Sequence, residues 1–116
     1  LHIPLTKDTE NLINLETFKT MKKNLILINT SRGGVINELD LDYALKNKLI
    51  FGAGIDVFKI EPVTNENPLI KNKRVLLSPH SATFTNECKI RMAENTVQNI
   101  IDFFENKLDN SMTVKL

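Results

Sequence analysis

The chain has 116 residues, of which 41% are hydrophobic and 25% are charged, a composition typical of an ordinary globular protein. The 15 Lys and Arg residues nearly balance the 14 Asp and Glu residues, so bulk charge does not suggest binding to nucleic acid or to a membrane. No apolar run approaches the roughly 20 residues of a membrane span. The single cysteine, Cys88, excludes an internal disulfide and favours a reducing, cytoplasmic compartment.

Segments with strand and helix patterns alternate along the first part of the chain. Residues 1–5 have the pattern of the end of a strand, which Pro4 stops. Asn14 is a suitable N-cap for a helix over residues 15–22. Residues 25–28 form a continuous apolar run, which predicts a strand buried on both faces of a parallel sheet.

The same alternation continues to the end of the chain. Asn37 is the predicted cap of a second helix, and residues 52–57 and 74–77 have the pattern of two short strands. The longest helix is expected to start at Thr85 and to run to about residue 106. Its apolar stripe consists of Ile90, Ala93, Val97, Ile100, Ile101 and Phe104. This order predicts an α/β fold, a parallel sheet with flanking helices.

Three polar residues of complementary chemistry each follow a predicted strand: Arg32, Glu61 and His80. Ligands of open parallel sheets bind beyond the carboxyl ends of the strands, so we expect these side chains to meet at one edge of the sheet. Taken singly, each residue has a simpler interpretation. Arg32 is compatible with a solvated charge, Glu61 with a plain loop before proline, and His80 with a histidine bonded to the backbone.

The chain resembles the C-terminal part of the NAD-binding domain of D-isomer-specific 2-hydroxyacid dehydrogenases. The resemblance runs from residue 2 to about residue 107 and rests on six segments that occur in this order. They are HIPLTKDT at 2–9, LINTSRGGVINE at 27–38, AGIDVF at 53–58, EP at 61–62, NPL at 67–69 and LSPH at 77–80. The order and spacing of these segments are more specific than any one of them.

The resemblance implies a catalytic role for each of the three polar residues. Arg32 would bind the carboxylate and carbonyl oxygen of a small 2-oxo acid, because a guanidinium can pair with a carboxylate through two parallel hydrogen bonds. His80 would give a proton in reduction and take it in oxidation. Glu61 would hold the other ring nitrogen and favour the imidazolium by its charge. The hydride would come from NAD(H), since no side chain supplies one.

The resemblance also implies a set of contacts with the NAD cofactor. Its members would be Ile3, Pro4, Thr9, Thr30, Ser31, Arg32, Asp56 and His80. Asp56 would meet the nicotinamide carboxamide; the simpler alternative is an acid at the end of a strand that caps a turn. We expect no metal site.

The glycines limit what the chain can do by itself. Gly52-Ala53-Gly54 begins like the dinucleotide fingerprint, but Val57 stands where the third glycine should be. We therefore expect a piece of a longer enzyme, inactive alone; the resemblance implies that the full-length protein is a homodimer. Residues 1–107 would belong to the dinucleotide-binding domain, and residues 108–116 would reach into a substrate domain. An NAD-sensing regulatory protein without turnover is the alternative.

Overall fold

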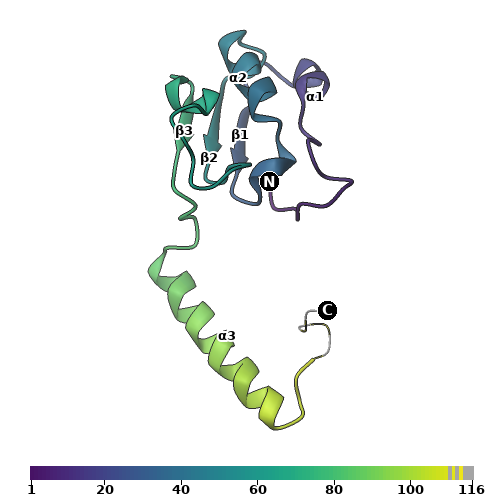
Figure 1. Cartoon of the computed structure of the whole chain (residues 1–116), viewed down its shortest axis with the longest axis vertical. Helices are drawn as coiled ribbons and strands as arrows, with labels where there is room; N and C mark the ends of the chain where they lie inside the picture. Colours follow the sequence, from purple (N-terminus) through teal and green to yellow (C-terminus); the bar gives the residue numbers. More distant parts are fainter. Residues whose placement is uncertain (110, 112, 114–116) are drawn as a thin grey trace. The chain divides into compact units, whose positions relative to one another are not determined.

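The computed structural model describes residues 1–109, 111 and 113. The chain divides into two units, Leu1–Ala82 and Thr83–Leu116. The first unit holds three strands, two α-helices and two 3₁₀ helices, and the second holds one long helix (Figure 1). In chain order they are α1 (Leu15–Thr20), β1 (Ile26–Asn29), η1 (Gly33–Val35), α2 (Glu38–Lys46), β2 (Gly52–Ile55), η2 (Pro68–Lys71), β3 (Val75–Leu77) and α3 (Asn86–Phe104).

The three strands form a parallel sheet in the order β1-β2-β3, which confirms the predicted α/β fold. The register places Ile28 opposite Gly54 and Gly54 opposite Leu76. Parallel strands need a crossover between them, and α2 provides it between β1 and β2. All three strands therefore end at the same edge of the sheet.

The helices of the first unit begin where their capping residues predict. The Asn14 side chain accepts from the backbone N–H groups of Glu16 and Thr17, and the Thr17 hydroxyl accepts in return from the Asn14 N–H. The Asn37 side chain caps α2 by accepting from the N–H groups of Leu39 and Asp40. These bonds satisfy N–H groups that have no partner within the helix.

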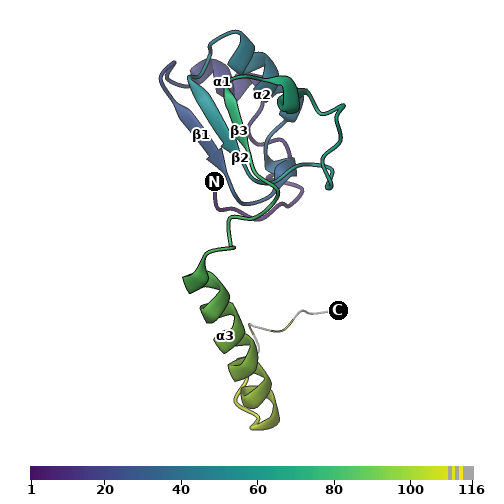
Figure 2. The same cartoon turned by 90° about the vertical axis from the view of Figure 1, so that its left-hand side faces the viewer.

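The core lies between one face of the sheet and the two helices, which are seen behind the strands in Figure 2. From α2, Leu41 and Leu45 are fully buried, and Phe18 of α1 joins them. Leu27 and Ile55 meet these side chains from the sheet. Burying each large apolar side chain stabilises the fold by roughly 1.5–3 kcal/mol.

The opposite face of the sheet is open to solvent. Ile26, Ile28 and Leu76 are 60%, 56% and 82% exposed. The prediction that residues 25–28 are buried on both faces is therefore wrong: within the first unit this strand is buried on one face only. An apolar run shows that side chains on both faces of a strand favour burial, but a face is buried only where another element covers it. Both α1 and α2 pack against the core face of the sheet, so neither covers the face of Ile26 and Ile28.

Some predicted bounds also differ from the structure. Residues 1–5 form no strand, although the Leu1 amino group donates to the Ile28 carbonyl at 2.6 Å. Helix α1 ends at Thr20 because Met21 is extended, and its N–H turns back to Phe18. The strand predicted over residues 52–57 ends at Ile55. The carbonyl of the next residue, Asp56, accepts from the N–H of His80 in the loop after β3.

In the second unit, Thr85, the expected first residue of the longest helix, is the N-cap of α3, and its hydroxyl accepts from the Cys88 N–H at 3.1 Å. The helix ends at Phe104, two residues before the predicted end, and none of its residues is buried. The boundary expected after residue 107 stays a prediction, and part of the expected tail lies outside the described residues. No helix in the described part of the chain combines the length and apolarity of a membrane span.

Gly33 provides a test of the packing between the loops. A Cβ at this position would lie 1.9 Å from the Phe58 carbonyl carbon, so we expect Gly33→Ala to lower the free energy of unfolding by about 1–3 kcal/mol or more. Gly54→Ala is the matched control, because its Cβ would come no closer than 3.7 Å to Ile28. Urea unfolding of both variants measures the difference; equal midpoints would contradict the close approach at Gly33.

Candidate active site

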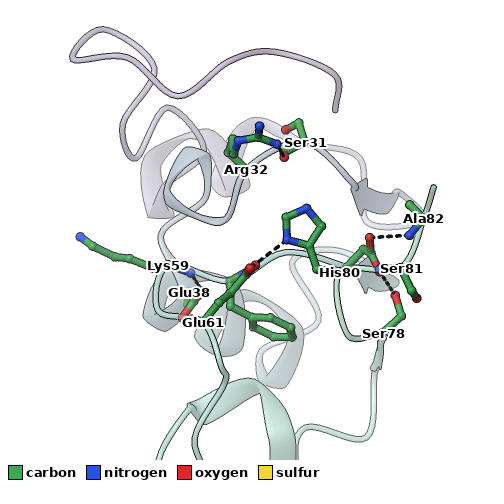
Figure 3. Close-up of polar contacts among 11 residues, drawn as sticks. Ser31, Arg32, Glu38, Lys59, Glu61, Ser78, His80, Ser81 and Ala82 are labelled. Carbon is green, nitrogen blue, oxygen red and sulfur yellow. Dashed lines mark hydrogen bonds and ion pairs between the residues drawn. The ribbon is translucent and has the colours of Figure 1, made fainter. Parts of the chain in front are cut away.

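The structure brings Arg32, Glu61 and His80 to the edges of one pocket of about 370 Å³. Arg32 follows β1, Glu61 lies in the loop after β2, and His80 follows β3. The convergence expected from the order of the elements is therefore present. Figure 3 shows the three side chains approaching from different segments of the chain.

A buried asparagine at the end of β1, Asn29, holds the backbone of Ser31 and Arg32 in place through hydrogen bonds. Asn29 Nδ2 donates to the Arg32 carbonyl at 2.9 Å, and Asn29 Oδ1 accepts from both the N–H and the hydroxyl of Ser31. The exposed Arg32 guanidinium donates through Nη1 to the Ser31 carbonyl at 2.7 Å. Among the described residues no carboxylate pairs with Arg32, which leaves its charge available to an anion.

The carboxylate of Glu61 joins two partners. Its Oε2 lies 2.8 Å from His80 Nδ1, and its Oε1 accepts from the Phe58 N–H at 2.8 Å (Figure 3). The hydrogen bond from His80 and then the one from Phe58 lower the pKa of Glu61, although burial opposes them. An ionised carboxylate only accepts hydrogen bonds, so His80 Nδ1 carries the shared proton. The other ring nitrogen, Nε2, is then the one that can exchange a proton with a ligand.

The backbone of His80 is in the left-handed region, with φ of 52°. This conformation is uncommon for residues other than glycine and costs free energy. Its N–H donates to the Asp56 carbonyl at 2.8 Å, which ties the residue to the end of β2. The conformation is therefore maintained by its surroundings, as often occurs at functional sites.

Asp56 closes the turn that carries His80. Its buried carboxylate accepts from the Ser78 hydroxyl at 2.5 Å and from the N–H groups of Ser81 and Ala82, both at 2.9 Å. Burial raises the pKa of Asp56, but these three hydrogen bonds outweigh it, and the net pKa lies below the ordinary value. This is the turn-capping arrangement considered as the alternative; the contact of Asp56 with a cofactor stays a prediction.

Most of the other residues predicted to contact a cofactor line a second pocket, of about 540 Å³. They are Ile3, Pro4, Thr30, Ser31 and Arg32. Thr9 does not line this pocket: its hydroxyl donates to the Pro4 carbonyl at 2.7 Å and so shapes the loop that does. Arg32 lines both pockets, which makes them neighbours.

Sequence reasoning did not single out several residues of this site. Glu10 and Lys59 line the pocket of Arg32 and His80, and their charged groups lie 3.4 Å apart. The polar residue that ends an apolar strand, Asn29, was a usable signal. No local pattern in the sequence predicts that the Glu38 side chain accepts hydrogen bonds from Lys59 and Asn67, in the loop that carries Glu61. Among the described residues no cluster of His, Cys, Asp or Glu could hold a metal ion.

Comparison with known proteins identifies the family. The model of the "D-isomer specific 2-hydroxyacid dehydrogenase, NAD binding domain" family matches residues 1–82. Glyoxylate reductase from Thermococcus litoralis is 45% identical over 115 residues, which are 99% of this chain and 34% of that protein.

Two solved structures have the same fold, that of the C-terminal part of a Rossmann-type NAD-binding domain. An acyclic imino acid reductase, Bsp5, in complex with NADPH and D-Arg has a TM-score of 0.86 at 34% identity, covering 95% of this chain and 35% of its own. D-lactate dehydrogenase from Aquifex aeolicus, complexed with NAD and lactic acid, has a TM-score of 0.78 at 30% identity, covering 92% and 37%. The chain spans about a third of the length of these relatives. It belongs to the NAD-binding domain family of the D-isomer-specific 2-hydroxyacid dehydrogenases.

Proposed function

We propose that this chain supplies the substrate-binding and proton-transferring groups of an NAD-dependent dehydrogenase that interconverts a small D-2-hydroxy acid and its 2-oxo acid. The observation that carries the proposal is the pocket shared by Arg32, Glu61 and His80. A cation can bind the carboxylate of a 2-oxo acid, and a histidine held by a carboxylate can exchange a proton with its carbonyl oxygen.

Arg32 binds the substrate in this proposal. Its guanidinium is exposed to the pocket and has no acidic partner among the described residues. Two parallel N–H donors match the two oxygens of a carboxylate, and the same positive charge polarises the neighbouring ketone. The bond from Nη1 to the Ser31 carbonyl limits the positions that the guanidinium can take.

His80 moves the proton. With Nδ1 held by Glu61, Nε2 gives a proton to the carbonyl oxygen during reduction and removes it from the hydroxyl during oxidation. Glu61 accepts from Nδ1 and so fixes the plane of the ring. A nicotinamide cofactor, when bound, would supply the chemistry of hydride transfer to or from the substrate carbon.

The second pocket would hold the cofactor in this proposal. Thr30 and Ser31, which line it, would lie along the nicotinamide, and Ile3 and Pro4, which also line it, would lie on the adenosine and ribose side. Since Arg32 belongs to both pockets, a cofactor in one would lie next to a substrate in the other. The relatives named for glyoxylate and bound to lactic acid support a small 2-oxo acid as the substrate class. A homodimer in the cytoplasm stays a prediction.

A hybrid enzyme tests the role of His80. When this chain replaces the matched third of the Thermococcus litoralis glyoxylate reductase, we expect NADH-dependent reduction of glyoxylate, and we expect none from the chain alone. His80→Gln in the hybrid should lower kcat by roughly 10²–10⁴-fold, because the positioned proton donor is lost.

The control for this experiment is Lys22→Gln, which changes an exposed residue that lines neither pocket. Absorbance of NADH at several concentrations of glyoxylate gives kcat and KM for each variant. A His80→Gln hybrid with normal kcat would refute the role of His80. A folded parent hybrid that binds NADH without turnover would favour the regulatory alternative.

Arg32→Lys separates charge from geometry. The substitution keeps the positive charge but loses the paired donors, so we expect kcat/KM for the 2-oxo acid to fall about 10–100-fold in the hybrid. The affinity for NADH, measured by fluorescence, should change much less. An unchanged kcat/KM would show that Arg32 does not bind the carboxylate.

The pKa of Glu61 provides a test in the 116-residue chain itself. Because His80 and Phe58 donate to the ionised carboxylate, its folded pKa lies below the unfolded value of roughly 4.3. Ionised Glu61 therefore contributes stability above that pH, and the contribution is lost as the pH falls through the lowered pKa. His80→Gln should raise the titration midpoint of the Glu61 ¹³C carboxyl signal, whereas His2→Gln should not. A Glu61 midpoint that is the same in the parent chain and in His80→Gln would contradict the pairing of Glu61 with His80.

A further inference from the structure

We propose that Glu38, which does not line the substrate pocket, is a positioning residue that holds Glu61 against His80. The inference rests on the proposed function, because positioning matters only if Glu61 serves His80. Glu38 would act through the loop that carries Glu61 and would touch neither substrate nor cofactor.

The carboxylate of Glu38 binds this loop on both sides of Glu61. Oε1 accepts from the Lys59 N–H at 2.6 Å, and Oε2 accepts from Asn67 Nδ2 at 2.8 Å. Lys59 precedes Glu61 by two residues, and Asn67 follows it by six. One side chain therefore anchors both flanks of the segment, and Figure 3 shows Glu38 beside the Lys59 backbone.

The Lys59 anchor lies next to the backbone group that orients Glu61. The adjacent residue, Phe58, donates its N–H to Glu61 Oε1, while Glu61 Oε2 meets His80. A displacement of Lys59 therefore displaces the Phe58 donor as well. Gly33 adds to this anchor, because the absence of a Cβ lets it lie directly against the Phe58 carbonyl.

The Asn67 anchor is fixed by a second bond. Asn67 Oδ1 accepts from the Leu69 N–H at 3.0 Å, which caps η2 and leaves Nδ2 directed to Glu38. The Leu69 side chain is fully buried in the core. The far side of the Glu61 loop is thus connected to the hydrophobic core through Asn67.

Glu38 itself occupies a rigid position. It is the first residue of α2, directly after the cap Asn37, where the helix dipole favours a negative charge. The side chains of Leu41 and Leu45, on the same helix, are buried in the core and hold the helix against it. A carboxylate on a packed helix is a better anchor than one on a loop, because the helix backbone is already ordered and little further conformational entropy is lost when the side chain binds.

The test measures the Glu61 titration midpoint by ¹³C NMR in the 116-residue chain. Glu38→Ala should raise this midpoint toward the ordinary glutamate value of roughly 4.3, because the donors to Glu61 lose their alignment. Glu16→Ala is the matched control: it removes an exposed carboxylate near the start of the other helix, α1, and should leave the midpoint unchanged. Circular dichroism shows whether each variant keeps its helices.

Two milder variants decide the matter if Glu38→Ala fails to fold. Asn67→Ser keeps a hydroxyl to cap Leu69 but removes the Nδ2 donor, and Glu38→Gln keeps one acceptor for Lys59. Each should raise the midpoint by less than His80→Gln does. In the hybrid enzyme, Glu38→Ala should lower kcat roughly tenfold with little change in KM for glyoxylate, and Glu38→Gln should restore part of kcat.

The outcomes separate this inference from the proposed function. If the folded Glu38 and Asn67 variants leave the Glu61 midpoint at the parent value while His80→Gln raises it, the positioning role is overturned and the pairing stands. If His80→Gln also leaves it unchanged, the coupling between Glu61 and His80 fails, and the proposed function fails with it.

Discussion

The three strands run parallel and in register, so the segments that follow them leave the sheet at one edge. These segments carry Arg32, Glu61 and His80, which are far apart in the sequence. Every other feature of the candidate site depends on this arrangement, because a slip of one strand would move its loop away from the other two. The sheet therefore sets which residues can meet, and the loops set how they meet.

Carboxylates then fix the geometry within the loops. Glu61 holds the ring of His80, Asp56 closes the turn around it, and Glu38 holds the loop of Glu61. Each accepts hydrogen bonds from at least one backbone N–H. Hydrogen bonds to the ionised form lower the pKa of two of these carboxyl groups: those from His80 and Phe58 in Glu61, and those from Ser78, Ser81 and Ala82, against the effect of burial, in Asp56. Arg32, in contrast, has no acidic partner among the described residues and can receive an anion.

Local signals in the sequence predicted the helices well and the exposure of the sheet poorly. Asn14, Asn37 and Thr85 cap the three α-helices, because a cap depends only on the next few residues. The exposure of Ile26 and Ile28 depends instead on what covers the far face of the sheet, and an apolar run carries no such information. The convergence of the candidate site was predictable from the order of strands and polar residues.

The sequence by itself determined the alternation of strands and helices, the family resemblance and the identity of the three polar residues. Those properties follow from local periodicity, capping and the spacing of short segments. Only the tertiary structure decided that Asp56 closes the turn of His80 and that Glu38 spans 21 residues to reach the Lys59 backbone. The physical reason is that side-chain hydrogen bonds to a distant backbone depend on how loops pack, and packing has no local sequence pattern.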